Sequence, residues 1–427
     1  MKNVAIIGFG CAGYHAAKAL REKDPSCRIH VFSNTHEAPA NPMLTTYYVA
    51  GRIPRSGVFP LGDKQHIKET LDIELHEDTT VKRILAQERT VILDNGTEAS
   101  FDEIILASGS HPFVPPIPGL PKKNVYVMRT VDDADRLLEA IHDGISSALV
   151  IGASWVGIKV VEALTAHHVP TAMADMAPCI FPTAILPDVA EEIHRRLENK
   201  GISLLFGRGI ASMEEQEDGI LCNFSDGSSI KTGIVALCLG LRPSIDYLDP
   251  TEIDINRGIR VDAGQHTSVP HIYAVGDCCE AKEIIHNQYV VVNLWANAVR
   301  QGTVAGKNAA GGTEAFQGNF THNITHFLGM DFIGIGDNRA KGKTITYNSP
   351  DGAMMFRAII ESGKIACINI LDNYQISGAL KNYMIKRVLG SNEPFDDKSR
   401  VQMIEDPMGR MLIGILEDAS CTSVKAN

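Results

Sequence analysis

The sequence opens with Val4-Ala5-Ile6-Ile7-Gly8-Phe9-Gly10-Cys11-Ala12-Gly13, an apolar run that leads directly into closely spaced glycines. The apolar residues are typical of a buried parallel strand, and the glycines follow the pattern G-x-G-x-x-G. Gly8 permits a tight turn, Gly10 lets the backbone approach a pyrophosphate, and Gly13 lets the next helix pack on the strand. The segment therefore predicts a dinucleotide site that contains Gly8, Gly10, Ala12 and Gly13.

One usual component of such a site is missing. A carboxylate normally ends the second strand, where it binds the ribose hydroxyls. Here the second predicted strand, residues 29–32, runs into Ser33 and Asn34. Asn34 and Glu37 are the two candidates to replace the acid, and we assign Asn34 to the site.

The same pattern recurs 144 residues later (152 − 8), after the apolar residues 148–151. In this copy a serine replaces the middle glycine, and the next predicted strand ends at Asp175, 23 residues after Gly152 (175 − 152). A carboxylate there binds the ribose of NADH and repels the 2′-phosphate of NADPH, so NADH is the favoured nucleotide. The second site comprises Gly152, Ser154, Trp155, Val156, Gly157 and Asp175.

Composition excludes several other classes of protein. The chain has 427 residues, of which 44% are hydrophobic, and its net charge of −11 argues against nucleic-acid and membrane-surface partners. Nine cysteines without a CxxC or Cys-His cluster indicate neither a disulfide scaffold nor a metal site. The apolar runs are far shorter than the roughly 20 residues of a membrane helix. We expect a soluble, cytoplasmic protein without a signal peptide.

Two dinucleotide sites in one chain indicate a tightly held FAD and an exchanging NADH. Four further segments extend this pattern, namely residues 104–110 (IILASGS), 236–243 (ALCLGLRP), 267–277 (TSVPHIYAVGD) and 295–302 (WANAVRQG). With these segments the chain resembles the FAD/NAD(P)H oxidoreductases of the glutathione-reductase structural class. The resemblance assigns Ser108, Gly109, Gly240, Gly276, Asp277, Trp295 and Ala298 to cofactor binding. Among these, Asp277 is expected to accept a hydroxyl of the ribityl chain.

The resemblance also implies an α/β fold in three domains. Two are Rossmann-like: a split FAD-binding domain of residues 1–114 and 246–315, and an NAD-binding domain of residues 115–245. Residues 316–427 are expected to form a C-terminal α+β interface domain, which commonly supplies a dimer contact. A homodimer is therefore the expected assembly.

Within this class the chain is most similar to reductases of rubredoxin and ferredoxin and to the flavin half of nitrite reductase. Those proteins carry R-P-x-L-S-K where this chain has Asn41, Pro42 and Thr46, which we assign to the flavin site. The chain lacks a C-x4-C after the first helix and any cysteine in residues 41–46, which argues against thiol-based mechanisms.

Lys159 stands where the family has a glutamate, and it is the one candidate catalytic residue. A cation beside the flavin would stabilise the hydride-accepting state. The alternative is a lysine that reaches from a helix into solvent.

The function expected from this resemblance is hydride transfer from NADH to FAD, followed by electron transfer to a ferredoxin- or rubredoxin-like protein. Two alternatives stay open. One is direct reduction of a small organic substrate at the flavin, and the other is a flavin-binding regulatory protein with vestigial turnover.

Overall fold

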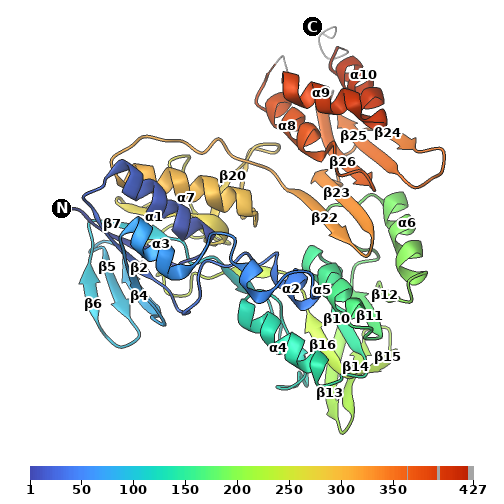
Figure 1. The fold of residues 1–427 in the computed structure, drawn as a ribbon, viewed down its shortest axis with the longest axis horizontal. Helices are drawn as coiled ribbons and strands as arrows, with labels where there is room; N and C mark the ends of the chain where they lie inside the picture. Colours follow the sequence, from blue (N-terminus) through green and yellow to red (C-terminus); the bar gives the residue numbers. More distant parts are fainter. Residues whose placement is uncertain (363, 392–394, 422–427) are drawn as a thin grey trace. The chain divides into compact units, whose positions relative to one another are not determined.

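The computed structural model describes residues 1–362, 364–391 and 395–421, which divide into two compact units (Figure 1). The first unit comprises residues 1–114, 127–138 and 240–319, and the second comprises residues 115–126, 139–239 and 320 onward. The first thus joins the two segments expected to bind FAD and adds residues 127–138. The second joins the expected NAD-binding and C-terminal segments, whose separation into two domains stays a prediction.

A five-stranded parallel sheet forms the centre of the first unit, in the order β19-β7-β1-β2-β3. Its strands are β1 (Asn3–Ile7), β2 (Arg28–Phe32), β3 (Ile73–His76), β7 (Glu103–Leu106) and β19 (Ile272–Ala274). The central strand β1 is buried from Val4 to Ile7. Burial on both faces explains why its sequence is a continuous apolar run rather than an alternating one.

The two faces of this sheet have different covers. On one face, α1 (Cys11–Lys23), α3 (Lys64–Leu71) and α7 (Trp295–Ala309) contribute to one hydrophobic core. On the other face, a second core includes side chains of the antiparallel strands β4 (Val81–Leu85) and β5 (Thr90–Leu93), which continue into β6 (Glu98–Ser100).

Small residues bring α1 and α7 unusually close together, side by side in Figure 1. A Cβ on Gly302 would lie 2.3 Å from the carbonyl oxygen of Ala12, and one on Gly306 would lie 2.2 Å from that of Ala16. The N-termini of both helices are adjacent as a result, since the Sγ atom of Cys11 lies 3.9 Å from the carbonyl oxygen of Trp295.

Shorter elements complete the first unit. The helical ones are α2 (Thr45–Val49) and two 3-10 turns, Arg55–Val58 and Gly276–Cys278. The strands are β8 (Ser110–Pro112), β17 (Leu241–Pro243), β18 (Ile259–Arg260), β20 (Cys279–Glu283) and β21 (Gln288–Val290). The helix α4 (Val131–His142) begins in this unit.

The second unit contains another parallel sheet, in the order β12-β11-β10-β16-β9. Its strands are β9 (Val125–Tyr126), β10 (Ala148–Ile151), β11 (Thr171–Asp175), β12 (Ser203–Phe206) and β16 (Ile234–Leu237). The accompanying elements are α5 (Trp155–Ala166), α6 (Pro187–Glu198) and the antiparallel strands β13 (Ile210–Gln216), β14 (Gly219–Phe224) and β15 (Ser229–Thr232). Both parallel sheets confirm the predicted pair of dinucleotide-binding folds.

An antiparallel sheet and three helices form the C-terminal part of the second unit. The sheet order is β22-β23-β26-β25-β24, with β22 (His322–Phe327), β23 (Met330–Gly336), β24 (Lys343–Asn348), β25 (Met355–Glu361) and β26 (Lys364–Leu371). The helices are α8 (Ser377–Val388), α9 (Asp397–Glu405) and α10 (Pro407–Cys421). Among the described residues, no helix has the length and apolar character needed to cross a bilayer.

Candidate active site

The first glycine-rich turn joins β1 to α1 in the first unit. Gly8 has a φ of +111°, and a Cβ there would lie 2.3 Å from the carbonyl oxygen of Ala107. A Cβ on Gly13 would lie 2.0 Å from the carbonyl oxygen of Gly8, so both positions require glycine for backbone packing. At Gly10, by contrast, a Cβ would meet no described atom within 4 Å.

The open space at Gly10 lies at the N-terminus of α1. The described residues provide no side-chain cap for this helix end, whose amide groups and dipole favour a negatively charged group. Ala12 is buried next to Gly276 and leaves little room for a side chain there, because a Cβ on Gly276 would lie 3.1 Å from the Ala12 Cβ. The open space and the free helix end have the form that the pyrophosphate of FAD requires, and the assignment of these residues to FAD stays a prediction.

Asp277 follows Gly276 and has an ionic partner that sequence reasoning missed. Its Oδ2 atom accepts hydrogen bonds from Arg129 Nη2 at 2.7 Å and from Ser110 Oγ at 3.0 Å. Gly276 is fixed separately, since its N–H donates to Gln301 Oε1 at 3.0 Å. The Asp277 carboxylate is therefore held in place, and its Oδ1 atom still has lone pairs for a ribityl hydroxyl.

The predicted residues 108 and 109 lie where the first chain segment meets the later one. Ser108 Oγ donates to the carbonyl oxygen of Ser244 at 2.7 Å and accepts from the Tyr247 hydroxyl at 2.9 Å. Gly109 has a φ of +69°, and its carbonyl accepts from Ser244 N–H at 3.0 Å. These two residues thus join the segments. Gly240 begins the returning segment, with a φ of +103° and open space at its Cβ position.

The candidates for the missing acid differ in their surroundings. Asn34 is exposed just after β2. Glu37 accepts a 2.7 Å hydrogen bond from Arg55 Nη2, and the guanidinium of Arg55 also pairs with Asp135. The Glu37 carboxylate is thus already engaged in an ion pair, whereas Asn34 is open to solvent.

The segment that replaces R-P-x-L-S-K forms a turn and the short helix α2. Asn41 Oδ1 accepts from Met43 N–H at 3.0 Å, and Asn41 N–H donates to the carbonyl of Val58. Pro42 accepts from Thr45 Oγ1 at 2.8 Å, and Thr46 is buried. The polar groups of Asn41 and Pro42 thus define the turn, and their contact with a flavin stays a prediction.

The predicted cofactor-binding residues Trp295 and Ala298 lie at the N-terminus of α7, and their contact with FAD stays a prediction. This 15-residue helix begins at Trp295 without a side-chain cap from the described residues, and Ala298 is buried in its first turn. Asn297 accepts a hydrogen bond from Asn319, which fixes the start of the helix. Such an end stabilises negative charge in front of it.

The second glycine-rich turn joins β10 to α5 and repeats the backbone of the first. Gly152 has a φ of +112°, and a Cβ on Gly157 would lie 2.0 Å from the carbonyl oxygen of Gly152. Ser154 caps α5: its Oγ accepts from Gly157 N–H at 3.1 Å and donates to the carbonyl of Cys238 at 3.0 Å. Val156 is half-buried in the first turn of the helix.

Asp175 ends β11 beside this turn. Its Oδ2 accepts from Ala153 N–H at 2.7 Å and its Oδ1 from Ala177 N–H at 2.8 Å, so backbone groups orient the carboxylate. Each oxygen keeps a lone pair for a ribose hydroxyl. A nearby guanidinium, that of Arg208, is paired with Ser228 and Asp226. These contacts fit NADH better than NADPH.

Trp155 stacks within an aromatic cluster of the second unit. Its ring lies 4.1 Å from Phe181 at 15° and 5.6 Å from Phe332 at 11°. The cluster fixes the first residue of α5 next to the turn.

Lys159 is buried, with only 4% of its surface exposed, and the solvent-facing alternative is therefore wrong. Its ammonium group pairs with Glu162 and donates to the carbonyl of His326 at 2.7 Å. Glu162 Oε1 accepts from Leu328 N–H at 2.8 Å. The pair therefore ties α5 to the β22–β23 turn, and a catalytic role for Lys159 stays a prediction.

The fold and these turns define a protein that binds two dinucleotides for redox chemistry. Residues 2–302 match the model of the pyridine nucleotide-disulphide oxidoreductase family, and the chain belongs to that family. It is an FAD-dependent enzyme that uses NADH, with NADPH less favoured.

Individual relatives extend this comparison. The chain is 26% identical to an NADH oxidase of Methanocaldococcus jannaschii over 94% of this chain and 96% of that protein. It is 24% identical to a rubredoxin-NAD(+) reductase of Alcanivorax borkumensis over 66% of this chain and 73% of that protein. The structure of a water-forming NADH oxidase from Lactobacillus brevis superposes with a TM-score of 0.86, at 19% identity, over 98% of this chain and 100% of that one.

Proposed function

We propose that this enzyme passes electrons from NADH through FAD to a small iron protein of the ferredoxin or rubredoxin type. The observation that carries the proposal is the state of the cysteines. None of the thiols whose side chains the structure describes is suited to relay electrons, which supports the flavin itself as the donor to the acceptor. The relationship to the Alcanivorax borkumensis rubredoxin-NAD(+) reductase supports this acceptor class.

The eight cysteines whose side chains the structure describes are all free, and burial raises the pKa of every one. Cys11, in the first turn, has its pKa raised to about 12 by burial and by the charge of Asp277. A thiol must ionise before it attacks a disulfide or a peroxide. Thiol chemistry at neutral pH is therefore disfavoured.

The adjacent pair Cys278 and Cys279 illustrates the point. Both side chains are buried, at 0% and 1% exposure. The Cys278 thiol donates to the carbonyl of Val275 at 3.2 Å, and the Cys279 thiol donates to that of Gly276 at 3.3 Å. These contacts are those of structural thiols, so the pair supplies no redox relay.

The residues of this chain then act by binding and orientation. FAD, when bound, supplies the chemistry that connects a two-electron donor to one-electron acceptors. The open N-terminus of α1 would hold its pyrophosphate, and Arg129 fixes the Asp277 carboxylate that would accept a hydrogen bond from the ribityl chain. Asp175 holds the ribose of NADH at the end of β11.

Anaerobic stopped-flow spectroscopy tests this proposal. The purified enzyme is reduced with one equivalent of NADH and then mixed with oxidised ferredoxin, oxidised rubredoxin or a small organic acceptor. Rapid reoxidation of the flavin by an iron protein, with stoichiometric reduction of that protein, is the expected result. Reoxidation by the organic acceptor alone would favour direct substrate reduction, and slow reduction by NADH would favour a regulatory role.

Dioxygen is the second candidate acceptor, because the similarity to the Methanocaldococcus jannaschii NADH oxidase covers nearly the whole of both chains. The same reduced enzyme is mixed with air-saturated buffer. Reoxidation by dioxygen that is faster than by either iron protein would replace the first proposal with this one.

We further propose that the enzyme is a cytoplasmic homodimer. The free thiols are consistent with a reducing compartment. The C-terminal part, expected to supply the dimer contact, exposes Val401 and Ile404 on α9. Light scattering coupled to size exclusion measures the mass, and Val401→Lys is expected to yield monomers if α9 forms the contact.

A further inference from the structure

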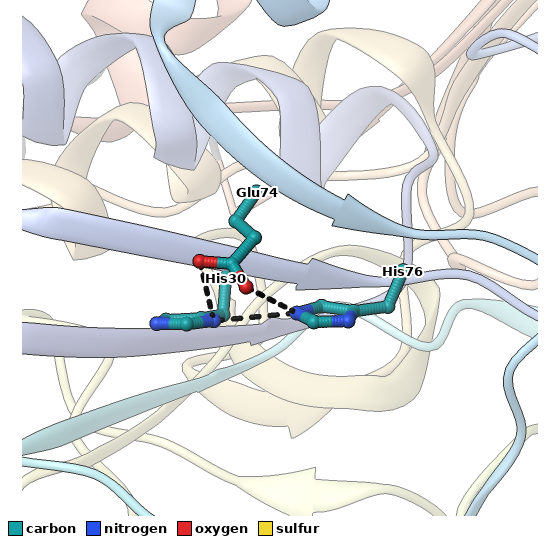
Figure 2. Close-up of side chains that lie close together, drawn as sticks. All are labelled: His30, Glu74 and His76. Carbon is teal, nitrogen blue, oxygen red and sulfur yellow. Dashed lines mark hydrogen bonds and ion pairs between the residues drawn. The ribbon is translucent and has the colours of Figure 1, made fainter.

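A cluster of two histidines and one carboxylate lies on strands β2 and β3, apart from the residues assigned to either cofactor. We propose that His30, Glu74 and His76 form a binding site for a divalent transition-metal ion of the zinc type (Figure 2). The donor atoms of the three side chains all lie within 4.8 Å of one another. Imidazole nitrogen and carboxylate oxygen are ligands that Zn²⁺ prefers.

The pairing of the two parallel strands creates this cluster. His30 lies opposite Glu74, and Phe32 lies opposite His76. Residues two apart on a strand point to the same side, so all three polar side chains share one face of the sheet. No compact motif in the sequence indicates this site, because His30 and His76 are 46 residues apart and lie together only in the folded sheet.

The distances suit a metal ion. The Nδ1 atom of His30 lies 3.2 Å from Nε2 of His76, and the Glu74 carboxylate lies 3.6 Å from the former and 3.9 Å from the latter. Two ligands at about 2.0–2.1 Å from a tetrahedral Zn²⁺ lie about 3.3 Å apart. The two nitrogens are already near that separation, and Glu74 needs only a small side-chain movement.

Neighbouring aromatic rings hold the histidines in position. His76 stacks on Phe32 at 4.6 Å and 10°, and His30 meets the edge of Phe101 at 5.3 Å and 64°. A neutral imidazole can carry its proton on either ring nitrogen, so Nδ1 of His30 and Nε2 of His76 can both present a lone pair to an ion.

Solvent reaches the cluster through Glu74, whose side chain is 52% exposed. Arg28 competes for this carboxylate, with its Nη2 atom 3.3 Å from Glu74 Oε2. Since β3 is the last strand in the described sheet order, a bound ion would fasten this strand to β2. The proposal concerns a structural site and is independent of the proposed electron acceptor.

Isothermal titration of the FAD-loaded enzyme with ZnCl₂ tests the proposal. We expect one saturable site per chain, with an affinity at least tenfold weaker in His30→Gln and in His76→Gln. The matched control is His266→Gln. His266 also pairs with a carboxylate, that of Asp262 at 3.0 Å, but it does not belong to the group of His30, Glu74 and His76. This control should bind Zn²⁺ as the unmodified enzyme does.

Two exposed positions test the carboxylate without disturbing the interior. Glu74→Gln should weaken Zn²⁺ binding, whereas Arg28→Gln should tighten it because the competing guanidinium is removed. Each variant is first checked for unchanged FAD content and melting temperature. A titration without a saturable site, or equal Zn²⁺ affinity in the His76→Gln, Glu74→Gln and unmodified enzymes, would overturn the proposal.

Discussion

The two glycine-rich turns share a backbone and differ at the middle residue. In both, the first glycine has a φ near +110° and the last glycine packs against its carbonyl oxygen. Gly10 leaves open space before a helix that no described side chain caps, whereas Ser154 caps its helix through Gly157 N–H. The first turn leaves its amides to a ligand, and the second satisfies one amide itself. We infer that the first suits a permanently bound dinucleotide and the second an exchanging one.

Filling the open space at Gly10 is expected to have the largest effect. Gly10 has a φ of −86°, so Gly10→Val introduces no left-handed strain and should fold. Its side chain would occupy the space assigned to the pyrophosphate and should yield colourless protein. The ratio of absorbance at 450 nm to that at 280 nm measures FAD, and circular dichroism measures folding. A folded Gly10→Val protein that retains full FAD would contradict the assignment of the first turn to the pyrophosphate of FAD.

The second region contains a buried ion pair immediately after its turn. Lys159→Met removes the positively charged partner of Glu162 and should lower the free energy of unfolding by about 3–5 kcal/mol, because a buried carboxylate then lacks its counter-charge. Adding Glu162→Gln should restore much of that loss. Urea denaturation followed by circular dichroism gives the free energies of unfolding. Equal stability of the unmodified protein, Lys159→Met and the double variant would show that the ion pair does not stabilise the fold.

The same Lys159→Met variant tests the predicted catalytic role. The rate of flavin reduction by NADH is measured by stopped flow in variant protein that retains FAD. A decrease of about ten- to a hundredfold, equivalent to about 1.4–3 kcal/mol, would support a cation beside the reacting hydride. An unchanged rate would assign Lys159 to structure alone.

Arg129 tests whether a fixed Asp277 carboxylate is needed for FAD binding in the first region. Arg129→Met leaves the Asp277 carboxylate without its 2.7 Å ionic hydrogen bond, so this group is less well positioned for the ribityl chain. We expect FAD to dissociate about ten- to a hundredfold more readily, from the roughly 1.5–3 kcal/mol of a hydrogen bond to a charged group. Fluorescence of released flavin on dilution measures the dissociation constant. Arg83→Met, which removes an exposed arginine near Asp249, is the matched control.

The nucleotide preference tests Asp175 in the second region. Asp175→Ser removes the charge that favours NADH and should reduce the preference for NADH over NADPH about tenfold, equivalent to about 1.4 kcal/mol. The ratio of kcat/KM values for the two nucleotides gives the preference. Equal use of both nucleotides by the unmodified enzyme would rule out this role for Asp175.

Much of the fold was predictable because its signals are local. The apolar strand, the glycines and the helix of each turn follow one another directly in the chain, within residues 3–23 and 148–166. The contacts that sequence reasoning missed join distant residues. Arg129 and Asp277 are 148 residues apart, and Lys159 and His326 are 167 apart. No local sequence pattern indicates such pairs, because the two residues become neighbours only when the chain folds.

The smallest expected effect concerns the cap that distinguishes the two turns. Ser154→Ala removes the acceptor for Gly157 N–H and should lower the free energy of unfolding by about 1 kcal/mol. The converse variant, Gly10→Ser, should give α1 a cap and stabilise the FAD-free protein by a few tenths of a kcal/mol, while FAD binds more weakly. Urea denaturation of FAD-free protein measures both changes. If Gly10→Ser instead binds FAD as tightly as the unmodified enzyme, the amides of α1 are not reserved for the cofactor, and the difference between the turns lies elsewhere.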